Sequence, residues 1–156
     1  MKRGGAPVGR VADLAAVEAA AVIYFRLWCE GPPSRGQIED DFCAILGPVQ
    51  GQRAALALGG MLDLCARHGR RPLMRHGRAC ACLGADEACF ANFIASAVEG
   101  PREDALLMAM LLVRPDVAPV LAAMASQFGL ALSRMQLRAP RDMAGADAQG
   151  AERVLH

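Results

Sequence analysis

Aromatic residues are scarce in this chain: Phe, Trp and Tyr together make up 4% of the 156 residues. Strands favour aromatic and β-branched side chains, so this scarcity argues against a large sheet. Hydrophobic residues nevertheless amount to 54% of the sequence, which excludes a disordered chain. The core must therefore consist mainly of Leu, Ala, Val and Met, and small side chains of this kind suit closely packed helices. We expect an all-α fold.

Long uncharged apolar runs are absent too. A membrane-spanning helix needs about 20 such residues, whereas the longest run, residues 105–113, ends at Arg114. The N-terminus does not match a secretory signal peptide, because the apolar stretch that follows Lys2 and Arg3 is interrupted by charges. We therefore expect a cytoplasmic protein that does not bind membranes, and we expect its six cysteines to be reduced thiols.

A strong net charge is also lacking. The formal charge is +1, with 17 Lys or Arg residues against 16 Asp or Glu residues, so we expect no nucleic-acid partner. Lysine accounts for only one of these 17 basic residues, and the excess of arginine, alanine and glycine is typical of high-GC bacterial coding. The charge is unevenly distributed, however, because residues 67–78 contain five arginines and no acidic residue.

Hydrophobic residues recur with helical periodicity over most of the chain. The expected helices span residues 13–29, 35–46, 48–68, 86–99, 102–113 and 117–137. We therefore predict an irregular bundle of about six helices in a single domain, residues 13–137, with a flexible N-terminus, residues 1–12, and a mobile C-terminal tail, residues 138–156. The helix at residues 102–113 is apolar on nearly all sides, so we expect it at the centre or in the interface of a homodimer.

A long connector, residues 67–84, joins the third and fourth predicted helices. It has no helical period after residue 69 and contains Pro72, which does not allow a straight helix to continue. Ordered connectors of this length are often functional. Guanidinium groups suit carboxylates and phosphates, so we expect the connector to contact an acidic protein partner or a small anion. The expected contact residues are Arg70, Arg71, Arg75, His76 and Arg78. Acidic groups expected to pair with these arginines are Glu39, Asp40, Asp41 and Glu103.

Thiols and imidazoles in the same region suggest an alternative function. Zinc binds to Cys and His side chains, and the candidate ligands are His76, Cys80, Cys82 and Cys89. A single residue separates Cys80 from Cys82, whereas structural zinc sites favour a longer spacing, and the nearby arginines would repel a cation. Basic neighbours instead favour the reactive thiolate form of cysteine. The alternative is thus a metal-binding or thiol-redox-responsive protein with zinc as cofactor, although our first expectation is that no cofactor binds.

Recognisable catalytic motifs are missing from the sequence. It contains no G-x-S-x-G, no H-E-x-x-H, no P-loop and no dinucleotide-binding fingerprint. A Cys–His pair could form from Cys80 or Cys82 with His76 or His68, but any segment so rich in these residues offers such pairs. We therefore predict no catalytic residue and no cofactor-binding residue, and we expect a non-enzymatic interaction or regulatory protein.

Three short strings resemble segments of a bacterial all-helical protein family of unassigned function. They are residues 71–76 (RPLMRH), the pattern Cys80-x-Cys82-x-Gly84-Ala85-Asp86-Glu87, and residues 102–105 (REDA). The resemblance covers residues 14–137. It implies a compact helical domain and brings no activity, cofactor or catalytic residue with it.

Overall fold

The computed structural model describes residues 3–138 of the chain. Six α-helices make up most of this part: α1 Ala16–Trp28, α2 Pro32–Leu46, α3 Pro48–His68, α4 Ala85–Glu99, α5 Arg102–Leu112 and α6 Ala118–Arg138. Two short strands, β1 Pro7–Arg10 and β2 Cys82–Gly84, form an antiparallel pair, and 3-10 turns at Arg3–Gly5 and Val11–Asp13 flank β1. The all-α prediction is confirmed.

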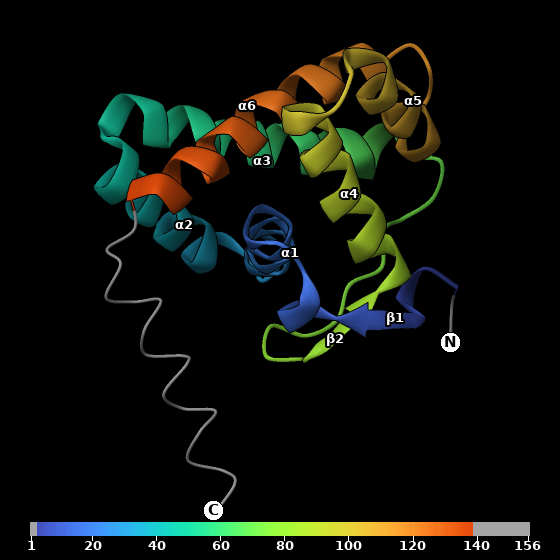
Figure 1. The fold of residues 1–156 in the computed structure, drawn as a ribbon, viewed down its shortest axis with the longest axis horizontal. Coiled ribbons are helices and arrows are strands. Elements are labelled where there is room, and N and C mark those ends of the chain that lie inside the picture. Colours follow the sequence, from blue (N-terminus) through green and yellow to red (C-terminus); the bar gives the residue numbers. More distant parts are fainter. Residues whose placement is uncertain (1–2, 139–156) are drawn as a thin grey trace, which may run out of the picture.

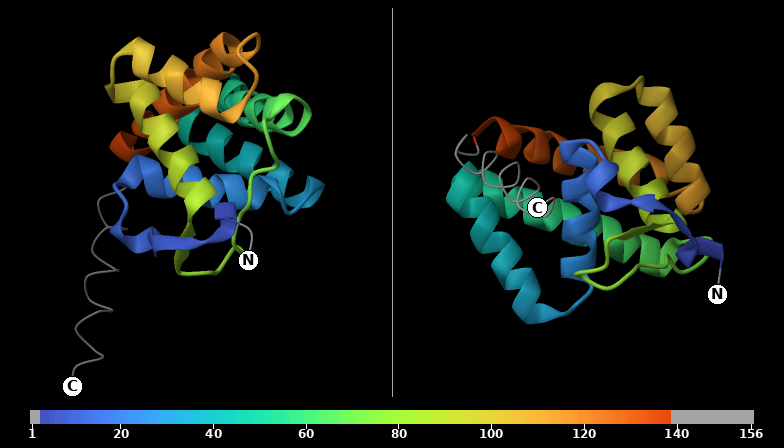
Figure 2. Two further views of the ribbon diagram at one scale, coloured as in Figure 1. Left: turned by 90° about the vertical axis from the view of Figure 1, so that its right-hand side faces the viewer. Right: turned by 60° about the horizontal axis from the view of Figure 1, so that its bottom comes forward.

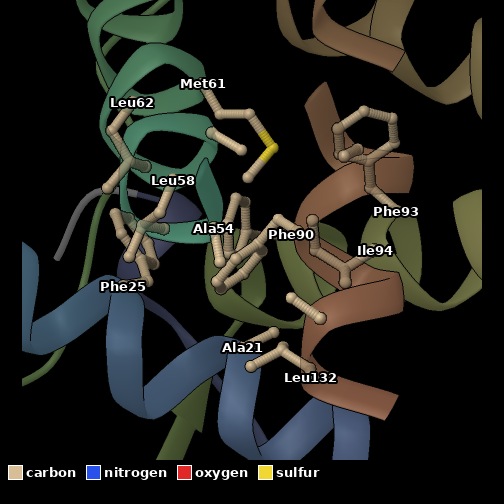
Figure 3. Packing of buried hydrophobic residues seen from close by; sticks show 14 of the residues in the cluster. Ala21, Phe25, Ala54, Leu58, Met61, Leu62, Phe90, Phe93, Ile94 and Leu132 are labelled. Atoms are coloured by element: carbon tan, nitrogen blue, oxygen red, sulfur yellow. The ribbon is translucent and has the colours of Figure 1, made fainter. Parts of the chain in front are cut away.

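The helices form an irregular bundle in which α3 and α6 lie side by side, while α1 and α4 pack beneath them (Figure 1). All five phenylalanines are buried, and they come from α1, α2, α4 and α6. The rings of Phe25 on α1 and Phe90 on α4 have centroids 5.0 Å apart. Leu58 and Met61 of α3 belong to the same cluster (Figure 3). Elsewhere the core is built largely from Ala, Leu and Met, as the composition predicts.

Proline and glycine mark the turn between α2 and α3. Gly47 has a φ of +89°, which side-chain-bearing residues rarely adopt, and Pro48 follows at the first position of α3. The two helices pack so closely here that a Cβ on Gly51 would collide with the backbone of Phe42 and Cys43. The predicted bounds of 48–68 coincide with those of α3.

The N-terminal segment is not the flexible extension that we predicted for residues 1–12. Residues 7–10 pair with β2, and Ala85 N donates a further hydrogen bond to Ala6 O. Gly4 is buried, and a Cβ there would collide with the side chains of Asp86 and Arg71. Backbone pairing and a close glycine contact determine the position of residues 4–10 in the structure, and side-chain composition reveals neither.

Helix α5 is not central. Only Ala105 and Ala109 of this helix are buried, whereas Leu107 and Leu111 are 61% and 75% exposed. α5 lies at the edge of the bundle against α4 and α6 (Figure 1). Among residues 3–138, no helix is both long enough and apolar enough to cross a bilayer. The tail predicted for residues 138–156 lies outside the described residues, apart from Arg138 at the end of α6.

Candidate functional site

The connector, residues 67–84, descends along one side of the bundle from the end of α3 to β2, where it meets β1 near the start of α4 (Figures 1 and 2). Its first part is fastened to the end of α5. Arg70 N donates a hydrogen bond of 3.1 Å to Leu112 O, and Arg114 N donates one of 3.1 Å to His68 O. Backbone hydrogen bonds therefore attach this end of the connector to the end of α5. Its other end is attached by the pairing of β2 with β1.

Glu87 holds the middle of the connector against the bundle. It lies in the first turn of α4 and is fully buried. Its Oε1 accepts hydrogen bonds from Arg26 Nε at 2.7 Å and from His76 N at 3.0 Å. Its Oε2 accepts hydrogen bonds from Arg26 Nη2 at 2.8 Å and from Gly84 N at 2.9 Å. One carboxylate thus caps α4, pairs with α1 and binds the connector backbone.

Arg26 completes this arrangement from the last turn of α1. It is only 3% exposed, which is rare for arginine and requires that its charge and its donors be satisfied. Its Nη1 donates to Cys80 O and its Nη2 to Cys82 O, each at 2.7 Å, in addition to the bonds with Glu87. Among the described residues, no buried side-chain nitrogen or oxygen lacks a hydrogen-bond partner.

Asp86, the residue before Glu87, is a second buried anchor. Its Oδ2 accepts hydrogen bonds from Arg71 Nη1 and from Met74 N, each at 2.7 Å, and its Oδ1 accepts one from Arg71 Nη2. The Arg71 side chain is 57% exposed, whereas that of Asp86 is 3% exposed. A buried carboxylate therefore binds a guanidinium that still faces solvent.

Both carboxylates remain ionised near neutral pH. Burial raises the pKa of Glu87, but hydrogen bonds from Arg26 and from the backbone N–H groups of Gly84 and His76 outweigh burial and lower the pKa below its ordinary value of 4.5. Burial likewise raises the pKa of Asp86, and bonds from Arg71 and Met74 N lower it below 3.8. The negative charges that hold the connector are therefore present at neutral pH.

The side chains of Arg70, Arg75 and Arg78 each make one contact with a neighbouring element and stay exposed. Arg70 Nε donates to Met110 O at 2.7 Å, and Arg75 Nη2 donates to Cys29 O at 3.2 Å. These carbonyls lie at the ends of α5 and α1, where helices lack internal donors. Arg78 Nη1 lies 3.6 Å from Glu30. Ion pairs with Glu39, Asp40, Asp41 or Glu103, which we expected, do not occur among residues 3–138, because Asp86 and Glu30 are the nearer acids.

His76 and Cys80 form the one Cys–His pair, among those considered from the sequence, that the structure brings into contact. His76 Nδ1 lies 3.7 Å from Cys80 Sγ, and His76 Nε2 lies 2.9 Å from Gly5 O. A cavity of about 300 Å³ adjoins the imidazole and is lined by Arg26, Glu30, Arg75, His76, Gly77 and Arg78. His68 is elsewhere, 3.0 Å from Arg114 through its Nδ1.

The predicted zinc ligands are not assembled in the structure. Cys82 and Cys89 are exposed, and neither joins the pair formed by His76 and Cys80. Over residues 3–138, no three His, Cys, Asp or Glu side chains are placed so that they could share a metal ion. The arrangement is therefore suited to hydrogen bonding and thiol chemistry, and it offers at most two ligands to a metal.

Sequence reasoning missed the central role of Arg26. The residue lies inside the apolar face of α1, next to Phe25 and one turn after Val22, and a charge at such a position signals a buried partner. The predicted helix over residues 86–99 places Asp86 and Glu87 in its first turn, where acidic residues are favoured. That prediction describes their local role, whereas their distant partners depend on the fold.

Comparison of the chain with protein-family models, with curated proteins and with solved structures found no match. The function is therefore argued from the geometry of this chain and its chemistry.

Proposed function

We propose that this protein is a non-enzymatic interaction or regulatory protein that binds an acidic protein segment through its connector. The contact surface, called the connector face below, consists of Arg70, Arg71, Arg75, His76 and Arg78. One observation carries the proposal: buried carboxylates fix the connector backbone, while the guanidinium groups remain exposed. Arg71 and Arg78 keep 57% and 56% of their side chains exposed. A backbone ordered in advance reduces the entropy lost on binding.

Charge complementarity favours an acidic partner. Residues 67–84 contain no acidic residue. The exposed acid that contacts Arg78 of the connector face, Glu30, lies 3.6 Å away. A carboxylate from a partner could replace that contact with a bidentate bond to a guanidinium. Arg75 uses only Nη2 in its contact with Cys29 O, so its other N–H groups remain for a ligand.

We also propose that the protein is a homodimer that buries the outer side of α5. Leu107 and Leu111 are exposed one turn apart on this helix, and exposed apolar side chains that lie together favour association. A second copy of the chain carries the same apolar stripe, so two such helices can cover each other across a twofold axis. Light scattering should give twice the monomer mass, and Leu111→Glu should give the monomer mass. A monomeric wild-type protein would contradict the dimer.

The cytoplasm of a bacterium is the proposed location. All six cysteines are free, which suits a reducing compartment.

Fluorescence anisotropy with a labelled oligoglutamate peptide tests the connector face. We expect binding at low salt that weakens at about 0.15 M salt, because exposed charges are then screened beyond about 8 Å. The double variant Arg75→Gln/Arg78→Gln should bind about tenfold more weakly, since two exposed ion pairs together contribute about 1–2 kcal/mol. The matched control is Arg53→Gln/Arg134→Gln, which removes two exposed arginines of α3 and α6. Equal losses in the two double variants would contradict the proposal.

A further inference from the structure

The six free cysteines have different surroundings. Burial raises the pKa of Cys65 to about 11, and Cys82 and Cys89 are exposed. Among the described residues, Cys80 is the one cysteine that lies within hydrogen-bond distance of an imidazole. Cys80 itself is half-buried, and both of its neighbours in the chain, Ala79 and Ala81, are exposed. Its thiol is therefore placed beside a base, on a residue that is not fully buried.

The imidazole of His76 is oriented so that it can accept the proton of this thiol. A backbone carbonyl can only accept a hydrogen bond, so the contact with Gly5 O places the imidazole proton on Nε2. In the neutral ring Nδ1 is then the acceptor, and it faces Cys80 Sγ. A nucleophile, a base and a group that orients the base are the three parts of an activated cysteine.

The buried ion pair holds both members of this arrangement. His76 N donates to Glu87, and Cys80 O accepts from Arg26, which is itself bound to Glu87. In addition, Cys80 N donates to Gly77 O across a tight turn. The distance between the imidazole and the thiol is therefore set by the core of the protein and does not depend on a mobile loop.

The surroundings of the pair are predominantly basic. Arg75 and Arg78 line the cavity beside the imidazole, and Glu30 is the one acidic residue that lines it. Positive groups attract a negatively charged reactant. The volume of this cavity, about 300 Å³, lies at the lower end of the range for small-molecule sites.

We propose that Cys80 is a reactive thiol that exchanges with an anionic low-molecular-weight disulfide, with His76 as proton acceptor and Arg75 and Arg78 as contacts for the anion. The Cys80 S–H proton passes to His76 Nδ1, and the thiolate attacks one sulfur of the disulfide. A bond forms between Cys80 Sγ and that sulfur, the original S–S bond breaks, and the departing thiolate takes the proton from His76. Cys80 is oxidised, half of the reactant is reduced, and no other oxidant is needed. This inference does not depend on partner binding by the connector face.

Stopped-flow kinetics with the reduced full-length protein test the proposal. The probe is 5,5′-dithiobis(2-nitrobenzoate), a dianionic disulfide whose released thiolate is coloured. We expect one thiol per chain to react at least about tenfold faster than the exposed thiols, because a positioned base assists the transfer of its proton. The fast phase should disappear in Cys80→Ser and should remain in the matched controls Cys82→Ser and Cys89→Ser.

Two further variants assign the roles of the neighbouring residues. His76→Gln should slow the fast phase about tenfold, while circular dichroism should show an unchanged fold. Arg75→Gln/Arg78→Gln should slow the reaction with the dianionic probe and leave the reaction with neutral 4,4′-dithiodipyridine unchanged. This comparison of the two probes tests the site even if His76→Gln misfolds. A fast phase that survives in Cys80→Ser, or one that is equal in wild type and in a folded His76→Gln, would overturn the proposal.

Discussion

Glu87→Gln tests how much the buried ion pair stabilises the fold. The substitution keeps the shape of the side chain and removes its charge, so the guanidinium of Arg26, which is 3% exposed, loses its counter-charge. Each carboxylate oxygen accepts two hydrogen bonds, so two of the four are lost whichever oxygen becomes the amide nitrogen. Removing one partner of a buried pair costs about 3–5 kcal/mol. Domains are typically stable by about 5–15 kcal/mol, so this loss is large.

Urea unfolding followed by far-UV circular dichroism measures the effect. With a slope of about 2 kcal/mol per molar urea, the midpoint should fall by about 2 M while the slope stays constant. The matched control is Asp63→Asn, which breaks the exposed pair with Arg67, whose side chain is 71% exposed. Such a pair contributes about 0–1 kcal/mol.

A double-mutant cycle separates the pair from its surroundings. Arg26→Met/Glu87→Gln leaves no unpaired charge in the core, so its loss of stability should be smaller than the sum of the two single losses. Additive losses, or a midpoint shift for Glu87→Gln that equals the shift for Asp63→Asn, would refute the reasoning.

Other predictions concern pH, helix packing and a buried thiol. The pKa values of Asp86 and Glu87 are lower in the folded than in the unfolded protein. Their contribution to the free energy of unfolding is therefore complete above the ordinary value of 4.5 and is lost as pH falls through the lowered values. Between neutral pH and acid, the urea midpoint should fall less in Glu87→Gln than in the wild-type protein. Gly51→Ala should destabilise the protein by about 1–3 kcal/mol because its Cβ meets the backbone of α2. Gly36→Ala, where a Cβ has open space, should stabilise it by about 0.5–1 kcal/mol in the same assay. Iodoacetamide should label Cys65 slowest, because burial raises its pKa to about 11, and denaturant should remove this protection.

The helices could largely be predicted, because their signals are local. Pro48 at the start and Gly69 at the end define α3 within the sequence itself. α2 begins at Pro32, three residues before the predicted start at residue 35, because Pro suits the first position of a helix.

The candidate site could be located from the sequence, but its construction could not. The arginine-rich, non-periodic connector was recognisable, and the contact between His76 and Cys80 was among the pairs considered. Arg26 and Glu87 are separated by 61 positions, so their pairing depends on how α1 and α4 cross. The β1–β2 pair was missed because strands of four and three residues depend on backbone hydrogen bonds and contain no apolar alternation.

Amide hydrogen exchange, followed residue by residue with NMR, tests the central claim that buried carboxylates fix the connector. His76 N donates to Glu87 and Met74 N donates to Asp86, so both amides should exchange slowly, whereas Gly77 should exchange rapidly. In Glu87→Gln, the protection of His76 should fall more than that of Met74. If His76 and Met74 exchanged as fast as Gly77 in the wild-type protein, the account of the connector as a fixed surface would be contradicted.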